Sequence, residues 1–197
     1  MKIDVLPLGI YQVNCYICSD EETKRCVLID PGAFTTALTN FLQENELKPA
    51  AVLLTHAHFD HVGGVKALAE AFRIPVYICE KDTVLPEKLT AGPLCYTDTY
   101  ETGDTVKIDS MEFRVMETPG HTPGSVCLIC GDTIFCGDTL FAGSCGRTDL
   151  FGGDHATILN SLRNLAALEG DYTVLPGHGP ATLLSRERAY NPFMKGL

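Results

Sequence analysis

The heptapeptide THAHFDH, residues 55–61, places three histidines and one aspartate directly after the apolar run AAVLLT. His56 and His58 stand two residues apart, so in an extended chain their side chains project to the same side and can bind one ion. Asp60 and His61 come after the chain turns into the glycine-containing helix start HVGG, from which they can reach a second ion. Burying so many imidazoles without a metal would cost several kcal/mol. The heptapeptide therefore predicts a metal site.

Three further residues of the ligand type follow strand-like runs in the second half of the chain. VMETPG precedes His121, TIFCG precedes Asp138, and YTVLPG precedes His178. In sheet proteins, sites are commonly built at the edge where strands end. Imidazole and carboxylate are suitable ligands for zinc, iron or manganese, and no thiolate is needed. His155 differs, because it opens a predicted helix behind Asp154, which we expect to be its N-cap, and we interpret this histidine as structural.

Strand-like and helix-like segments alternate along both halves of the chain. The first thirty residues are typical of three short strands, and the helix TTALTNFLQENEL follows with apolar residues at helical spacing. The second half begins with four strands and continues with the helix HATILNSLRNLAAL and the strand YTVLP. We expect the tail LLSRERAYNPF to form one short helix. This order predicts an α/β protein in which residues 1–197 form one αββα domain.

The least regular stretch covers residues 81–104. We expect it to be a surface excursion near the site, since long irregular connections usually carry function. Tyr96 and Tyr100 in this stretch are candidates to line a pocket. Cys145, in GSCGRTD, lies close to the predicted site, and we interpret it as a small residue in a crowded loop rather than as a reactive thiol.

Composition argues against several classes of protein. The 15 basic and 25 acidic side chains give a formal net charge of −10. A sequence-independent grip on nucleic acid needs Lys and Arg to displace phosphate counterions, so we expect no nucleic-acid partner. We find no signal peptide and no apolar stretch of about 18 residues that would span a bilayer, so we expect no membrane association.

The nine cysteines are odd in number, and most lie inside apolar runs. The pairs Cys15/Cys18 and Cys127/Cys130 are three residues apart, so in a strand the two members point to opposite faces and cannot chelate one metal. We interpret the cysteines as small buried apolar residues, which favours a reducing, cytoplasmic location.

Four motifs in this order resemble the metallo-β-lactamase fold superfamily. They are THAHFDH (55–61), PGHTPGS (119–125), CGDTLF (136–141) and PGHGP (176–180). The stretch GDTLFAGSCGRTDL is similar to glyoxalase II-like (hydroxyacylglutathione hydrolase-like) enzymes. The resemblance covers nearly the whole chain and implies a four-layer αββα sandwich with two mixed β-sheets and a two-metal site at one edge.

The resemblance also implies a role for each ligand-type residue. His56, His58 and His121 match the ligands of a first metal. Asp60, His61 and His178 match those of a second metal, and Asp138 matches a bridging carboxylate. Arg147 resembles a basic residue that contacts the carboxylates of the substrate. The family more often has Lys at that position.

We expect from this likeness a hydrolase that cleaves a thioester or a related activated acyl bond. Two divalent metals, zinc in the first place with iron or manganese as alternatives, would share a hydroxide whose pKa falls from ~15.7 to about 7. Asp60 and Asp138 would hold the metals and hydrogen-bond the nucleophile, and a small acyl-thiol would be the substrate. Glyoxalase II proper carries a separate C-terminal helical domain for glutathione, whereas only 19 residues follow His178 here.

Three alternatives stay open at this point. The loop SCGRTDL also resembles persulfide dioxygenases, which hold a single iron with two His and one Asp, here His56, His121 and Asp138. A nuclease would share the metal site, but the chain shows no basic stripe for a phosphate backbone. A non-catalytic metal-binding domain is disfavoured, because structural zinc sites are usually closed by four ligands, many of them thiolates.

Overall fold

Two six-stranded β-sheets form the centre of the molecule in a computed structural model that describes residues 1–90 and 92–196. The strands of the first sheet, in spatial order, are β1 (Lys2–Leu8), β2 (Val13–Ser19), β3 (Arg25–Ile29), β4 (Lys48–Leu53), β5 (Val76–Cys79) and β6 (Asp98–Tyr100). Strands β1 to β3 pair antiparallel, and β3 to β6 pair parallel. This sheet is therefore mixed, as predicted.

The second sheet is mixed as well. Its spatial order is β14 (Thr182–Leu183), β13 (Thr173–Pro176), β10 (Thr133–Gly137), β9 (Val126–Cys130), β8 (Met111–Glu117) and β7 (Thr105–Ile108). All neighbouring strands pair antiparallel except β10 and β13, which pair parallel. A small hairpin, β11 (Leu140–Phe141) and β12 (Ser144–Cys145), follows β10 and is absent from the elements expected from the sequence.

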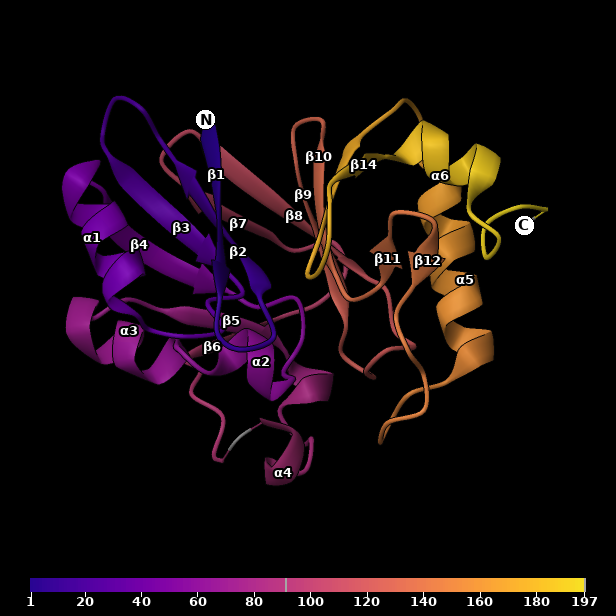
Figure 1. Cartoon of the computed structure of the whole chain (residues 1–197), viewed down its shortest axis with the longest axis horizontal. Helices are drawn as coiled ribbons and strands as arrows, with labels where there is room; N and C mark the ends of the chain where they lie inside the picture. Colours follow the sequence, from indigo (N-terminus) through magenta and orange to yellow (C-terminus); the bar gives the residue numbers. More distant parts are fainter. Residues whose placement is uncertain (91, 197) are drawn as a thin grey trace.

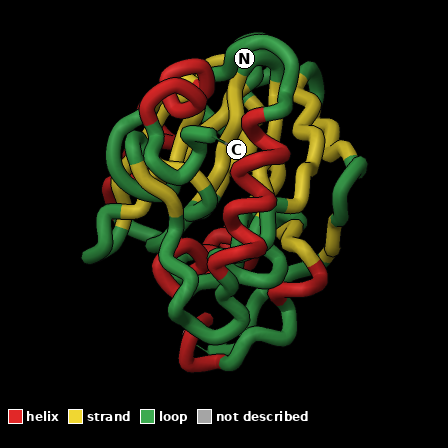
Figure 2. Tube along the Cα trace, turned by 90° about the vertical axis from the view of Figure 1, so that its right-hand side faces the viewer, coloured by secondary structure: helices red, strands yellow, loops and turns green. Residues whose placement is uncertain are grey.

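Helices cover the outer face of each sheet (Figure 1). The first sheet carries α1 (Thr36–Glu44) and α3 (Val65–Phe72), and the second carries α5 (His155–Ala166) and α6 (Leu184–Tyr190). Figure 2 looks onto the outer side of the second sheet and shows the long helix α5 lying across the strands. Three short helices, α2 (Phe59–Val62), η1 (Glu80–Asp82) and α4 (Glu87–Thr90), lie among the connections. The order helix, sheet, sheet, helix confirms the predicted four-layer αββα sandwich.

Alternating side chains along the strands fill the three spaces between these layers. On β3, Cys26 and Leu28 pack toward α1 and α3, whereas Val27 and Ile29 face the second sheet. The two-residue period of a strand produces this division. Cys15 and Cys18 fall into different clusters for the same reason. The expectation that such a pair cannot chelate one ion is thus confirmed.

Capping residues set the starts of two helices. The side chain of Thr35 accepts a hydrogen bond from the backbone N–H of Leu38 at the start of α1. Asp154 accepts one from the N–H of Thr157, at 2.7 Å, so it is the N-cap predicted for α5. His155 opens that helix with an exposed side chain. Among the helices of the described residues, none has the length and apolar character needed to cross a membrane.

The stretch 81–104 is more regular than the sequence predicts. It contains α4 and β6, which adds a parallel strand to the first sheet. Tyr100 on β6 is buried between the two sheets, and its hydroxyl donates a hydrogen bond to the carbonyl oxygen of Leu54. Tyr100 also lines a cavity together with Lys81 and Glu117, and none of the ligand-type residues predicted from the sequence lines that cavity. Tyr96 is exposed.

Candidate metal centre

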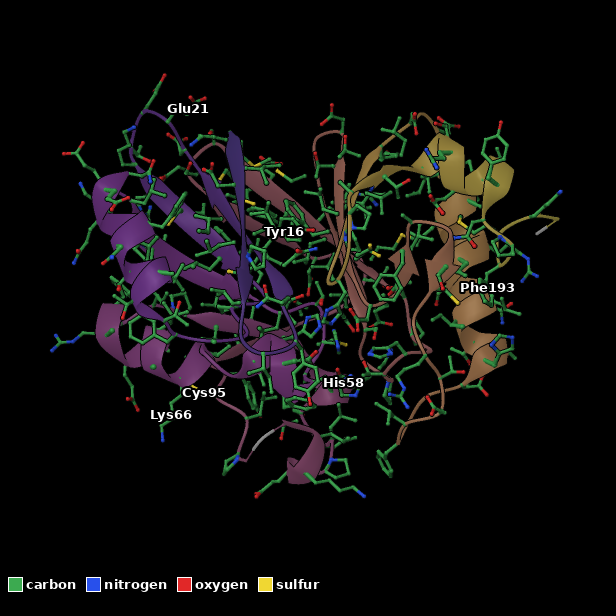
Figure 3. All side chains as sticks on the ribbon, viewed as in Figure 1. Tyr16, Glu21, His58, Lys66, Cys95 and Phe193 are labelled. Carbon is green, nitrogen blue, oxygen red and sulfur yellow. The ribbon has the colours of Figure 1, made fainter. Side chains whose placement is uncertain are left out.

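Seven side chains of the ligand type converge where strands of both sheets end. His56 and His58 follow β4, Asp60 and His61 lie on α2, His121 follows β8, Asp138 follows β10, and His178 follows β13. Figure 3 labels His58 between the two halves of the sandwich, at the end of the sheets opposite to Glu21. The structure thus brings together residues that are up to 122 positions apart in the chain, counted from His56 to His178.

The first set consists of His56, His58 and His121, each at most 4% exposed. The Nδ1 atom of His58 lies 2.9 Å from the Nε2 atom of His121. Two nitrogens bound to one tetrahedral zinc ion at about 2.0–2.1 Å would be about 3.3 Å apart. The pair is therefore spaced nearly as one shared ion requires.

The second set consists of Asp60, His61 and His178, whose candidate ligand atoms all lie within 4.8 Å of one another. The Nε2 atom of His178 is 3.2 Å from Oδ2 of Asp60, and that of His61 is 4.0 Å from the same oxygen. His178 is the most exposed of the three, with 31% of its side chain accessible. The second set therefore forms the open side of the centre.

Asp138 lies between the two sets. Its Oδ1 atom is 3.5 Å from Nε2 of His61, and its Oδ2 atom is 3.6 Å from Nε2 of His121. One carboxylate thus faces an imidazole of each set, which is the placement expected of a residue shared by two ions.

Several polar atoms at this centre are buried without a hydrogen-bond partner among the described residues. They are His56 Nε2, His58 Nε2, His61 Nε2 and Asp138 Oδ1. An unsatisfied buried donor or acceptor costs about 1–3 kcal/mol. The orphaned atoms of His56, His61 and Asp138 fit cation binding, whereas the His58 nitrogen that faces His121 is Nδ1. The set lacks thiolates, as zinc, iron and manganese sites can.

Neighbouring groups orient three of the imidazoles. His121 has its Nδ1 atom 2.8 Å from the carbonyl oxygen of Arg147, so Nδ1 carries the proton and Nε2 is left unprotonated. His61 has Nδ1 3.0 Å from Oδ2 of Asp30. His56 has Nδ1 3.1 Å from the hydroxyl of Thr55. Such outer partners select the tautomer that turns the other nitrogen toward a metal.

Asp30 and Thr55 are residues of the candidate site that the sequence analysis missed. The Thr55 hydroxyl donates to Oδ2 of Asp30 at 2.5 Å, so one carboxylate holds His61 directly and His56 through Thr55. A signal was available, because Asp30 follows the apolar strand RCVLI just as the other polar residues follow theirs.

Burial and neighbouring charges separate the pKa values of the histidines. Burial, together with the nearby His121, lowers the pKa of His58 to about 4, and burial lowers that of His56 well below its usual value. Burial also opposes protonation of His61, but the carboxylates of Asp138 and Asp30 outweigh it and raise its pKa well above normal. Without a metal, His56 and His58 are thus neutral, whereas His61 holds a proton.

Gly177 lets the turn that carries His178 approach the metal centre closely. A Cβ atom at Gly177 would lie 2.4 Å from Oδ1 of Asp138 and 2.6 Å from Cε1 of His61. Any side chain there would push the turn that carries His178 away from both residues. The PGHGP motif therefore places its histidine through a close backbone approach.

Arg147 contacts the centre through its backbone rather than its side chain. Its guanidinium is exposed and makes a two-pronged ion pair with Asp149, with both N–O distances at 2.7 Å. Cys145 is half-buried beside the core of the second sheet, and burial raises the pKa of its thiol. That environment disfavours a reactive thiolate, in agreement with the interpretation from the sequence.

The family model described as "Metallo-beta-lactamase superfamily" matches residues 8–178. Hydroxyacylglutathione hydrolase GloC from Haemophilus influenzae is 34% identical, with 98% of both chains covered.

Three solved structures are similar over nearly the whole chain. The BLEG-1 B3 metallo-beta-lactamase has a TM-score of 0.89 at 38% identity and covers 99% of this chain and 100% of its own. TTHA1623 in a di-iron-bound form has a TM-score of 0.85 at 39% identity, covering 96% and 99%. ETHE1 from Myxococcus xanthus has a TM-score of 0.84 at 30% identity, covering 98% and 84%.

Proposed function

Because this chain belongs to the metallo-beta-lactamase superfamily, we propose that it is a binuclear metal-dependent hydrolase that cleaves a thioester or a related activated acyl bond. One observation carries the proposal: Asp138 faces both sets of ligand-type residues, with one oxygen toward His61 and the other toward His121. The similarity to hydroxyacylglutathione hydrolase GloC supports the substrate class. The di-iron form of TTHA1623 supports occupancy by two ions.

The proposed roles follow the three groups of side chains. His56, His58 and His121 hold a first ion, Asp60, His61 and His178 hold a second, and Asp138 contributes to both. When bound, two divalent ions would supply an acidified water with a pKa of about 7 and a positive charge for the acyl oxygen. Zinc is the proposed metal, with iron or manganese as alternatives.

The chain's own residues would orient the reacting groups. Asp60 and Asp138 place carboxylate oxygens at the open side of the centre, where they can accept a hydrogen bond from the attacking water and hold it toward the acyl carbon. The hydrogen bond with His178 lowers the pKa of Asp60 and so keeps this carboxyl ionised. The ion pair with Arg147 does the same for Asp149. The burial of the histidines excludes bulk water from the inner side.

Arg147 is the proposed contact for a carboxylate on the thiol part of the substrate. Its guanidinium is already matched to a carboxylate, that of Asp149, in a two-pronged pair. A substrate carboxylate would compete for the same planar donors. Replacing Arg147 should therefore raise KM for acidic thioesters more than it lowers kcat.

A second candidate function is a persulfide dioxygenase with one iron held by His56, His121 and Asp138. The specific observation that favours it is that these three residues also lie together, with the rings of His56 and His121 4.8 Å apart and His121 Nε2 3.6 Å from Asp138 Oδ2. The ETHE1 structure fits this alternative as well as GloC fits the first.

Metal counting and a substrate panel test the proposal together. The purified protein is analysed for metals, then assayed with hydroxyacyl thioesters of glutathione, with β-lactams, and with glutathione persulfide in an oxygen electrode. The hydrolase proposal predicts two ions per chain and thioester cleavage that is lost on chelation and restored by zinc, iron or manganese. One iron with oxygen uptake would overturn it, as would full thioesterase activity of the metal-free protein.

A further inference from the structure

Asp82 is a buried carboxylate outside the seven ligand-type residues, and it touches both turns that supply the first set. Its Oδ2 atom accepts a hydrogen bond from the N–H of Ala57 at 2.9 Å, between His56 and His58. The other contacts are with the turn that carries His121. Oδ2 also accepts from the Thr122 hydroxyl at 2.8 Å.

The second oxygen completes this connection. Oδ1 of Asp82 accepts a hydrogen bond from the N–H of Gly124 at 2.6 Å. A Cβ atom at Gly124 would lie 2.6 Å from that oxygen and from the Asp82 backbone nitrogen, so the turn approaches as only glycine allows. Gly124 does not have the left-handed backbone that commonly explains a glycine. The close approach to Asp82 is therefore an independent reason for this residue.

We infer that Asp82 is a positioning residue for the first metal, which sets the distance between the histidines at positions 56 and 58 and the histidine at position 121. This inference rests on the proposed two-metal centre. The two turns come from different sheets, β4 and β8, and each contributes only part of the first set. A single carboxylate that accepts from both turns couples their positions without touching an imidazole.

The energetics suit such a role. A buried carboxylate that loses any one of its donors is left with an unsatisfied oxygen, so the two turns are held to one spacing. Loss of a residue that supports the ligands of a metal site commonly lowers the metal affinity by about 10–100-fold. A further bond, from Val126 N–H to Thr55 O at 2.9 Å, also joins the halves and would keep the fold assembled without Asp82.

The test compares Asp82→Asn with a matched control, Asp20→Asn. Asp20 likewise accepts from two backbone N–H groups, those of Glu22 and Thr23, and from one hydroxyl, that of Ser110. It lies in the turn between β2 and β3, beside Glu21, at the end of the sheets opposite to His58 (Figure 3). The whole chain is stripped of metal and titrated with cobalt(II), whose visible absorption reports each site, and zinc affinity is measured by chelator competition.

The inference predicts that Asp82→Asn weakens binding of the first ion, the one held by His56, His58 and His121, by about 10-fold or more and alters its cobalt spectrum. The second ion should bind within about threefold of the wild type. Asp20→Asn should leave both ions unchanged. If Asp82→Asn does not fold, Thr122→Val removes one bond to Asp82 and should produce the same selective loss in smaller degree.

Three results separate failure of the inference from failure of the proposed function. Wild-type affinity and spectrum for both ions in Asp82→Asn or in Thr122→Val overturn the inference and leave the binuclear centre standing. Equal weakening of both ions also overturns it, because the effect would not be selective. A wild-type chain that takes up only one cobalt ion overturns the proposed binuclear centre itself.

Discussion

The carboxylate of Asp30 lies 3.0 Å from the Nδ1 atom of His61, deep in the interior, with both side chains almost completely buried. The same oxygen of Asp30 accepts the hydroxyl of Thr55, which is 3.1 Å from Nδ1 of His56. One residue thus orients an imidazole in each of the two ligand sets. It does so from a turn 26 residues before His56, counting from position 30 to position 56.

The Asp30 arrangement predicts different losses for two substitutions. Asp30→Asn should weaken both ions by about 10–100-fold, because His56 and His61 both lose their fixed orientation. Thr55→Val should weaken mainly the ion held by His56, since the pair of Asp30 and His61 persists. Chelator competition with zinc measures both. Equal loss of the two ions in Thr55→Val would contradict the chain of contacts.

His121→Ala should empty or loosen one metal position and leave the fold largely intact. His56 and His58 lie in the first half of the chain, whereas His121, the third proposed ligand of the first set, lies in the second half. Metal content after dialysis and the circular dichroism spectrum measure the two effects. His155→Ala is the control, because His155 is an exposed histidine at the start of α5. Normal metal content and normal turnover in His121→Ala would remove the central assignment.

Metal binding to the second set should depend more steeply on pH than binding to the first. In the metal-free protein the pKa of His61 is raised by Asp138 and Asp30, so this imidazole is protonated at neutral pH and must lose the proton when a metal binds. The affinity then falls by about tenfold per pH unit for each proton displaced. His58 has a pKa of about 4 and stays neutral between pH 8 and pH 6.

Zinc titrations at pH 8 and pH 6 measure this difference. As the pH falls, the raised pKa of His61 makes proton competition stronger, so the second ion is expected to dissociate first. His178, whose pKa is raised by its hydrogen bond to Asp60, acts in the same direction. Parallel loss of both ions over this range would contradict the prediction.

Gly177→Ala should reduce metal binding at the second set, because the added methyl group would collide with Asp138 and His61. The neighbouring Gly179 is the matched control. It has a φ of +76° with open space around it, so Gly179→Ala strains the backbone without touching the centre. We expect Gly179→Ala to lose about 1 kcal/mol of unfolding free energy and keep its metals. Metal analysis together with urea unfolding distinguishes the two variants.

Tyr100→Phe should lower the free energy of unfolding by about 1–2 kcal/mol with little change in kcat or KM, because the lost hydroxyl satisfies the buried carbonyl of Leu54. Tyr96→Phe, at an exposed position, should leave stability unchanged. Urea denaturation of the two variants tests this. A changed KM with unchanged stability in Tyr100→Phe would place the ring in a binding site after all.

Much of the fold follows from local patterns in the sequence. The alternation of side chains along β3 follows from the two-residue period, and the cap of α5 follows from Asp154 ahead of a helical run. Strand β6 is missing from the elements expected from the sequence for a physical reason. Strand β6 is three residues long, and it is stabilised by pairing with β5 and by burial of Tyr100 between sheets, neither of which leaves a local pattern.

By itself, the sequence determined the types of the ligand residues and their positions directly after apolar runs, because both can be recognised from adjacent residues along the chain. Only the tertiary structure decided which residues support them. Asp30 and Asp82 act through hydrogen bonds to positions 25 or more residues away, such as Thr55 for Asp30 and Thr122 for Asp82. Hydrogen bonds act over about 3 Å in space, whatever the separation along the chain. Asp30 therefore meets Thr55 only once β3 and β4 have paired, and Asp82 meets Thr122 only once the two sheets have packed together.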